Sequence, residues 1–241
     1  MNHKIGKILI FPLVSILLLG IPKISGLITD MFEFSSIDPD GSFMWISVHH
    51  IAQAILFIPF FFVVKWFVKD ADFRLGLGDK KLGMLFVSRF SLYFLIYTLV
   101  MFGIIIMSNS LQPFIYDVTI RNVVGYLGFQ LLLSGPSEEL IFRAFAMTVF
   151  SMLFTKRLFN DRLSVSNLLA AIIFMLAHVS FHLFPFEYSY SFGQLMYSLT
   201  LGLIYGVCYE KTKSVVYPMI LHSVSNVISV GVTILATIFF F

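Results

Sequence analysis

The sequence of 241 residues contains little charge and a single cysteine. Only 12% of its residues are Asp, Glu, Lys or Arg and 59% are hydrophobic, whereas about 25% of the residues in a soluble domain are charged. Polar residues are too few to cover a water-soluble body, and no long hydrophilic segment exists to form a separate soluble domain. We therefore expect one membrane domain spanning residues 1–241.

The sequence also lacks several features that would indicate other functions. The lone Cys208 excludes an intramolecular disulfide and a metal site built from cysteines. Glycine-rich phosphate loops and internal repeats are missing. The net charge of +3 arises from basic residues in short loops between apolar runs, so it indicates membrane topology, and we expect no nucleic acid partner.

Long apolar runs predict the fold class. A transmembrane helix needs about 20 mostly apolar residues. The runs that meet this length lie at 8–29, 43–66, 83–107, 121–155, 164–184, 192–210 and 214–240. We expect an all-α transmembrane bundle of about seven spans, or eight if the last run breaks near Gly231. A kink is predicted at Gly135-Pro136 within the fourth run, because proline cannot donate a backbone hydrogen bond.

Basic residues in alternate loops predict the orientation. Of the 16 basic residues, twelve fall on one side of the predicted spans: Lys4, Lys7, Lys65, Lys69, Arg74, Lys80, Lys81, Lys156, Arg157, Arg162, Lys211 and Lys213. Loops rich in Lys and Arg stay in the cytoplasm. We therefore expect a multi-pass protein of the lipid bilayer, in a bacterial cell membrane, with its N-terminus in the cytoplasm.

Ionisable residues inside the later apolar runs are candidate functional groups, because they are costly at membrane depth. They are Glu138, Glu139, Arg143, His178, His182 and His222, with Asn226 one turn beyond the last of them. Glu139 and Arg143 are four residues apart, so they can form an ion pair on one helix face. Glu138 points about 100° away and is left as the carboxylate suited to act as a general base.

Each of these residues also has a structural interpretation. Glu139 and Arg143 alone would be a clasp between helices, and a single histidine would be an interhelical hydrogen bond. Together, the carboxylate, the two histidines and the asparagine supply a group that takes a proton from water and groups that hold an oxyanion, as hydrolysis requires. His49 and His50 in the second run are expected to be interfacial or packing residues.

Three short motifs carry a resemblance to a known family. Glu138-Glu139-x-x-x-Arg143, Phe174-x-x-x-His178 and His222-x-x-x-Asn226 resemble, in this order, the motifs of the CAAX protease and bacteriocin-processing family (Abi, or type II CAAX prenyl endopeptidases). They lie within a core of about 121–240. The resemblance implies peptide-bond hydrolysis in a helical bundle with an internal polar cavity, open to the cytoplasmic side and laterally to lipid.

The resemblance also implies residue roles. Glu138 and His178 would activate the attacking water, and His222 and Asn226 would stabilise the oxyanion. Glu139 and Arg143 would hold the helix of Glu138, with Glu139 as an alternative partner in the base role. We favour a mechanism that requires no cofactor. The alternative is a Zn²⁺ ion bound by Glu138, His178 and His222, since Glu and His are credible zinc ligands.

The expected substrate is a membrane-associated peptide or protein. Roles of the bacterial type, such as processing of peptide pheromones or bacteriocins and bacteriocin immunity, are favoured over a prenylated substrate by analogy within the family. One alternative is a non-enzymatic adaptor or immunity protein that regulates a membrane partner, such as a sensor kinase, through helix contacts. A proton- or ion-coupled transporter is disfavoured, because such folds usually show internal repeats.

Overall fold

The computed structural model describes residues 3–182 and 187–241, and these residues form seven helices and two short hairpins. The first three helices are α1 (His3–Thr29), α2 (Met44–Phe67) and α3 (Lys80–Met107). The last two are α8 (Phe192–Thr212) and α9 (Val216–Phe240). All five agree with the predicted runs. Because α9 continues through Gly231 without a break, it does not divide into the two spans of the eight-span alternative.

The fourth helix is continuous but changes its winding. It consists of α4 (Ile120–Phe129), the π-helical turn η1 (Gln130–Ser134), α5 (Gly135–Glu139), the π-helical stretch η2 (Leu140–Met147) and α6 (Thr148–Leu153). Pro136 has no N–H to donate to the preceding turn, and η1 ends two residues before it. The distortion predicted at Gly135-Pro136 thus takes the form of a π-helical turn, a feature often found at functional sites.

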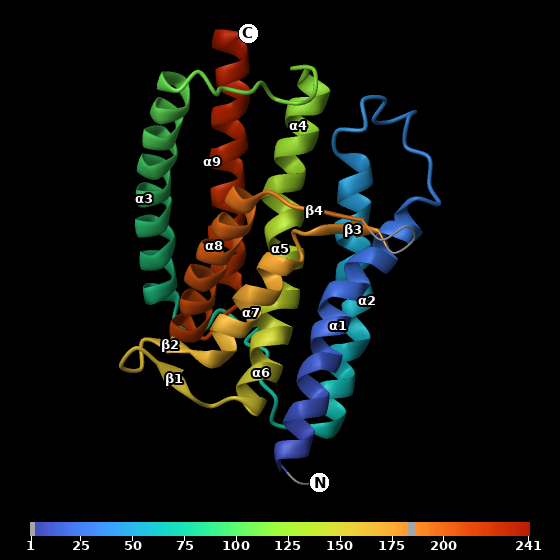
Figure 1. Ribbon diagram of the computed structural model, residues 1–241, viewed down its shortest axis with the longest axis vertical. Coiled ribbons are helices and arrows are strands. Elements are labelled where there is room, and N and C mark those ends of the chain that lie inside the picture. The colour runs from blue at the N-terminus through green and yellow to red at the C-terminus, as the bar shows by residue number, and fades with distance from the viewer. Residues whose placement is uncertain (1–2, 183–186) are drawn as a thin grey trace.

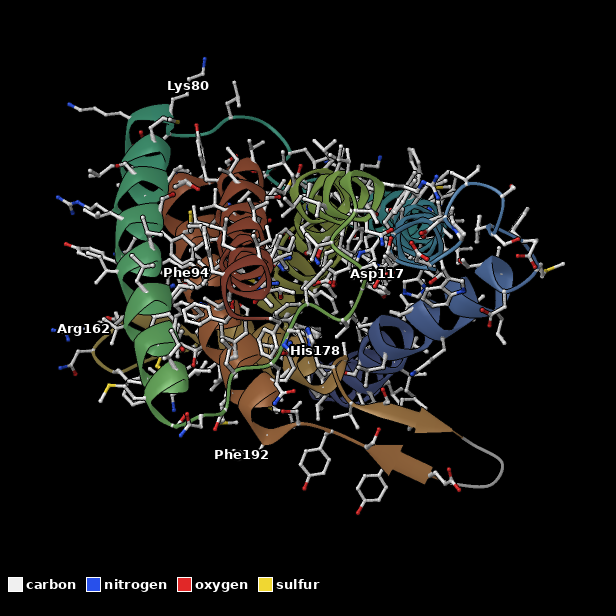
Figure 2. The ribbon with its side chains drawn as sticks, turned by 90° about the horizontal axis from the view of Figure 1, so that it is seen from above. Lys80, Phe94, Asp117, Arg162, His178 and Phe192 are labelled. Carbon is white, nitrogen blue, oxygen red and sulfur yellow. The ribbon has the colours of Figure 1, made fainter. Side chains whose placement is uncertain are left out.

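The predicted fifth span is shorter than expected. Helix α7 (Val165–Leu176) has only 12 residues, and the chain then forms the antiparallel strands β3 (Ser180–His182) and β4 (Glu187–Ser189). The prediction of a helix to residue 184 was wrong because it counted apolar residues without their periodicity. Phe181 pairs with Tyr188 across the hairpin, and aromatic residues favour such strands. Figure 2 shows the hairpin projecting from the bundle.

The fold class is all-α, with a second small hairpin, β1 (Arg157–Leu158) with β2 (Leu163–Ser164), before α7. Among the described residues, four helices are long and apolar enough to cross a membrane: α1 from Leu9, α2, α3 and α9. The protein is therefore a multi-pass membrane protein. The fourth helix, α7 and α8 do not meet that criterion by length and composition.

The helices are arranged so that the fourth helix lies between the α1–α2 pair and the group formed by α7, α8 and α9 (Figure 1). Helix α3 stands at the edge of the bundle and packs on α8 and α9. The loops at 68–79, 154–164 and 213–215 lie at the end of the bundle that holds the N-terminus, and the loops at 30–43 and 108–119 lie near the C-terminus (Figure 1).

Candidate active site

A polar cavity of about 400 Å³ lies within the bundle. Five helices contribute to it: α2, the fourth helix, α7, α8 and α9. Figure 2 shows His178 near the centre of the bundle when the molecule is seen from above. The polar and ionisable lining residues are His50, Tyr126, Gln130, Ser134, Glu138, His178, Gln194, Tyr197, Ser198, Tyr205, His222, Asn226 and Ser229. Glu138, His178, His222 and Asn226, predicted from the sequence, thus share one cavity.

Glu138 faces two imidazole rings. Its Oε2 lies 3.7 Å from Nε2 of His222, and its Oε1 lies 3.9 Å from Nε2 of His50. The side chain is 19% exposed, whereas that of Glu139 is fully buried. The carboxylate of Glu138 therefore reaches the cavity, and the two adjacent glutamates occupy different environments, as their positions around the helix predict.

Glu139 is the centre of a buried polar cluster. Its Oε1 accepts hydrogen bonds from Nη1 of Arg143 at 3.0 Å and from Nδ1 of His222 at 2.8 Å. The Arg143 guanidinium also donates to the carbonyl of Gly202 at 3.1 Å and lies over the Phe174 ring. The ion pair predicted from spacing is present, and it has a partner that the sequence did not indicate: Glu139 joins α5 to α9 through His222.

The partners of His222 fix its ring. Because an ionised carboxylate only accepts hydrogen bonds, the proton shared with Glu139 belongs to Nδ1, which leaves Nε2 facing Glu138. The ring stacks on Tyr205, with centroids 5.1 Å apart. One turn further along α9, Nδ2 of Asn226 donates to Oγ of Ser134 at 3.0 Å. Both α9 residues are thus tied to the fourth helix.

His178 is held by the end of its own helix. It lies two residues beyond the end of α7, and its Nδ1 is 2.8 Å from the carbonyl oxygen of Phe174. Carbonyls in the last turn of a helix have no helical partner, so Nδ1–H donates to this oxygen. Nε2 then carries the lone pair, available to the cavity that the ring lines.

His50 was expected to be an interfacial or packing residue, and it is instead part of the site. It is buried, and its Nδ1 lies 2.7 Å from Oγ of Ser137 and 3.0 Å from Nε2 of Gln53. A signal for it was present, since His50 and Gln53 are polar residues three apart in an apolar run and so share a face. His49, in contrast, stacks on Trp45, a packing role as predicted.

The predicted zinc ligands do not converge. Within residues 3–182 and 187–241, no group of three or more His, Cys, Asp or Glu side chains is close enough to hold a metal ion. Glu138, His178 and His222 line one cavity but do not surround a common point at the roughly 2 Å that zinc requires. As they stand, these residues do not fit a zinc site, and metal dependence stays a prediction.

An apolar groove adjoins the polar cavity. It has a volume of about 610 Å³ and lies between α3 and α8, where aromatic side chains of α3 such as Phe90, Phe94 and Tyr97 form one wall. Tyr197 and Leu201 of α8 line both the groove and the polar cavity. These two side chains are therefore the boundary between the site and the apolar flank of the bundle.

The cavity extends away from the basic loops. From Glu138 it continues along Ile46 and Gln194, each the third residue of its helix, and along Val230 in the second half of α9. These positions point to the end of the bundle with loops 30–43 and 108–119 (Figure 1). The basic loops lie at the other end. The expected cytoplasmic opening of the cavity and the expected cytoplasmic side of the basic loops both stay predictions.

Comparison with known proteins gives one match. Residues 120–228 match the model of the family described as type II CAAX prenyl endopeptidase Rce1-like, a range that runs from the start of α4 into α9 and contains all three motifs. Searches of curated proteins and of solved structures gave no significant match. Over residues 120–228, which hold the three motifs, the chain is similar to the Rce1-like type II CAAX prenyl endopeptidase family.

Proposed function

We propose that this protein is an intramembrane endopeptidase that hydrolyses a peptide bond in a membrane-associated peptide or protein. The observation that carries the proposal is the Glu138 carboxylate, which faces the His222 imidazole at 3.7 Å in a polar cavity inside an apolar bundle. Similarity to the endopeptidase family over the same residues supports it.

In the proposed mechanism, Glu138 and His178 activate a water molecule. His178 offers the Nε2 lone pair to orient the water, and Glu138 takes its proton as the new C–O bond forms at the substrate carbonyl. The neighbouring Glu139 does not compete with Glu138 for the proton of the water, because Glu139 is paired with Arg143. When the C–N bond breaks, Glu138 returns the proton to the leaving amine, so the enzyme ends the cycle unchanged.

Two side chains of α9 stabilise the oxyanion of the tetrahedral intermediate in this mechanism. Asn226 uses one N–H of its amide on Ser134 and has a second N–H to offer. His222 is held beside the oxyanion by the hydrogen bond from its Nδ1 to Glu139, as the aspartate of a catalytic triad orients its histidine. Arg143 then acts at a distance, by holding Glu139 in place. None of these steps requires a metal ion.

The surroundings of the site favour a substrate that resides in the bilayer. The apolar groove meets the polar cavity at Tyr197 and Leu201, so an apolar segment could lie in lipid beside α3 while its scissile bond reaches Glu138. We keep the orientation predicted from the basic loops, with the N-terminus in the cytoplasm. The scissile bond is then cut in the outer half of a bacterial cell membrane, as processing or immunity toward exported peptides would require.

Cleavage of membrane-anchored peptides tests the proposal. Purified protein in lipid nanodiscs is incubated with a labelled peptide library, using wild type, Glu138→Gln, His178→Ala and the control His49→Ala, each with and without a chelator. Loss of the general base should lower the rate about 10²- to 10⁴-fold, and His49→Ala should match wild type. Unchanged cleavage with the chelator supports the metal-free mechanism, whereas loss supports zinc.

The adaptor alternative predicts a different pattern. A protein that acts only through helix contacts does not need the Glu138 carboxylate. If the wild type cleaves no peptide and both site variants keep the full cellular phenotype, the endopeptidase proposal is wrong and the adaptor takes its place.

A further inference from the structure

His50 is a member of the site that the family match does not assign. The matched residues are 120–228, and His50 belongs to α2 (Met44–Phe67). It reaches the site because α2 packs against α5. A histidine from outside the matched region therefore stands beside the proposed catalytic carboxylate.

The contacts of the His50 ring determine where its proton lies. Nδ1 is 3.0 Å from Nε2 of Gln53, an amide nitrogen that can only donate. Nδ1 then accepts from Gln53, while Oγ of Ser137, 2.7 Å from Nδ1, also lies 3.2 Å from the Ser134 carbonyl oxygen, to which its hydroxyl donates. The ring proton of neutral His50 is therefore on Nε2, the atom that faces Oε1 of Glu138 at 3.9 Å.

The ring has little freedom to leave this position. His50 is 6% exposed and packs edge-on against Phe129, with centroids 5.0 Å apart. Ser137, whose Oγ lies close to Nδ1, immediately precedes Glu138. The distance of 3.9 Å is longer than a direct hydrogen bond, as is common for catalytic contacts before substrate binds.

The two oxygens of Glu138 thus have different neighbours. Oε1 faces the N–H of His50 on α2, and Oε2 faces Nε2 of His222 on α9. A carboxylate held at one oxygen presents the other in a fixed direction, which matters because small misplacements of a catalytic group are costly. Because the proton of His50 is assigned to Nε2 and that of His222 to Nδ1, only His50 has an N–H to offer this carboxylate, and it faces Oε1.

We propose that His50 is a positioning residue of this site: its Nε2–H holds Oε1 of Glu138 and thereby directs Oε2 to the attacking water. The inference rests on the proposed function for its role in turnover. The contact between His50 and Glu138 does not depend on that function, and it can be tested by itself.

The contact between His50 and Glu138 can be tested by measuring how readily the Glu138 carboxyl is protonated. The ionisable groups around this carboxylate are His50 from α2, His178 from α7, Tyr205 from α8, His222 from α9, and Glu139 and Arg143 from its own helix. A hydrogen bond from His50 favours the ionised carboxylate. Dicyclohexylcarbodiimide reacts with protonated carboxyls in apolar surroundings, so its reaction with Glu138 reports whether this bond exists.

The experiment compares carbodiimide labelling of Glu138 at pH 7 by mass spectrometry in wild type, His50→Phe, His50→Gln and the control His49→Phe. We expect labelling to rise about three- to tenfold in His50→Phe, since a charge-assisted hydrogen bond is lost, and less in His50→Gln, whose amide can donate. His49→Phe should match wild type. Equal labelling in wild type and His50→Phe would overturn the proposal.

A second variant covers the case in which His50→Phe does not fold. Gln53→Leu leaves His50 in place but removes the amide that keeps the ring proton on Nε2, so labelling should rise in the same direction by a smaller factor. Unchanged labelling in this variant, with the fold verified by its unfolding midpoint, would count against the assigned tautomer and therefore against the proposal.

The kinetics of peptide cleavage provide the second measurement. If the wild type cleaves a peptide, His50→Phe should lower kcat about 10- to 100-fold, as loss of an orienting partner typically does, with little change in KM and partial recovery in His50→Gln. A change in KM alone would contradict a positioning role. If the wild type cleaves nothing and the Glu138 and His178 variants keep the full cellular phenotype, the proposed function fails, but the labelling experiment still decides whether His50 holds Glu138.

Discussion

Glu139 and His222 are joined by a hydrogen bond of 2.8 Å between Oε1 and Nδ1, although 83 residues separate them in the sequence. The same oxygen accepts the Arg143 guanidinium at 3.0 Å. One carboxylate oxygen therefore connects the ion pair on the fourth helix to the histidine on α9. The orientation of His222 toward Glu138 depends on this bond.

Replacing Glu139 by glutamine should destabilise the protein and its site together. The variant leaves the buried Arg143 without a counter-ion, and breaking a buried pair costs about 3–5 kcal/mol. The midpoint of thermal unfolding in detergent measures the loss. The control Glu210→Gln breaks the partly exposed pair with Arg157, worth about 0–1 kcal/mol. Similar losses in the two variants would contradict the central role of Glu139.

Gly135→Ala should separate α5 from α9. A Cβ at this position would lie 2.9 Å from the backbone nitrogen of Ser223 and 3.0 Å from the carbonyl oxygen of Met219. Overpacking of this kind costs about 1–3 kcal/mol of stability. If α5 moves away from α9 to relieve the overlap, Glu138 moves away from His222, so peptide cleavage should fall as well.

The matched control for this change is Gly128→Ala. Gly128 lies in α4, where a Cβ would meet nothing within 4 Å, and alanine is favoured over glycine inside a helix by about 1 kcal/mol. We expect an unchanged or higher unfolding midpoint and normal cleavage. A Gly135→Ala variant as stable and active as Gly128→Ala would show that α5 and α9 are not tightly packed at this point.

Asp38 should make stability depend on pH only under acidic conditions. Burial tends to raise the pKa of Asp38, but hydrogen bonds from the backbone N–H groups of Met44, Phe43 and Ser42 outweigh it, and the pKa is lowered. The ionised carboxylate thus caps the start of α2. Its contribution is complete above the unfolded pKa of about 3.9 and is lost as the pH falls through the lower, folded value.

Asp38→Asn tests this dependence through unfolding midpoints measured at a series of pH values. At pH 7 the variant should be less stable by about 1 kcal/mol, as for the loss of a helix cap. The difference should stay constant from about pH 5 to pH 8 and narrow below about pH 4. Asp70→Asn, at an exposed position in the loop after α2, serves as the control. A difference that grows with acidity would contradict the assigned direction of the pKa shift.

Cysteine labelling tests the side on which the cavity opens. The native Cys208 is buried, so Cys208→Ala provides a background for single cysteines. In intact cells, a membrane-impermeant maleimide should react with Gln194→Cys, which lies on the exposed rim of the cavity, but not with Lys213→Cys in the loop before α9. The reverse pattern would place the basic loops outside and the cavity mouth in the cytoplasm.

Local patterns in the sequence determined much of the fold and part of the site. The long apolar runs gave α1, α2, α3 and α9 because a span of sufficient length and hydropathy forms a helix in the bilayer whatever its neighbours are. The spacing of Glu139 and Arg143 gave their ion pair, since residues four apart share a helix face. Three motifs sufficed to indicate the family.

Other features depended on contacts between segments distant in the sequence. The number of apolar residues between 164 and 184 did not distinguish a helix from the pairing of β3 with β4. Strand pairing depends on a partner across the hairpin, which a count of residues does not contain. His50 resembled a packing residue because its partner, Glu138, lies 88 positions further along the chain. The set of side chains that line the cavity followed from the packing of five helices together.

The sequence by itself therefore determined that this is a multi-pass helical membrane protein with a Glu, two His and an Asn in three of its later apolar runs, because helix formation and face periodicity are local properties. Only the tertiary structure decided that Glu139 holds His222, that His50 stands opposite it across Glu138, and that the cavity extends away from the basic loops. These relationships arise where helices pack, and the approach of two helices is set by all the side chains between them.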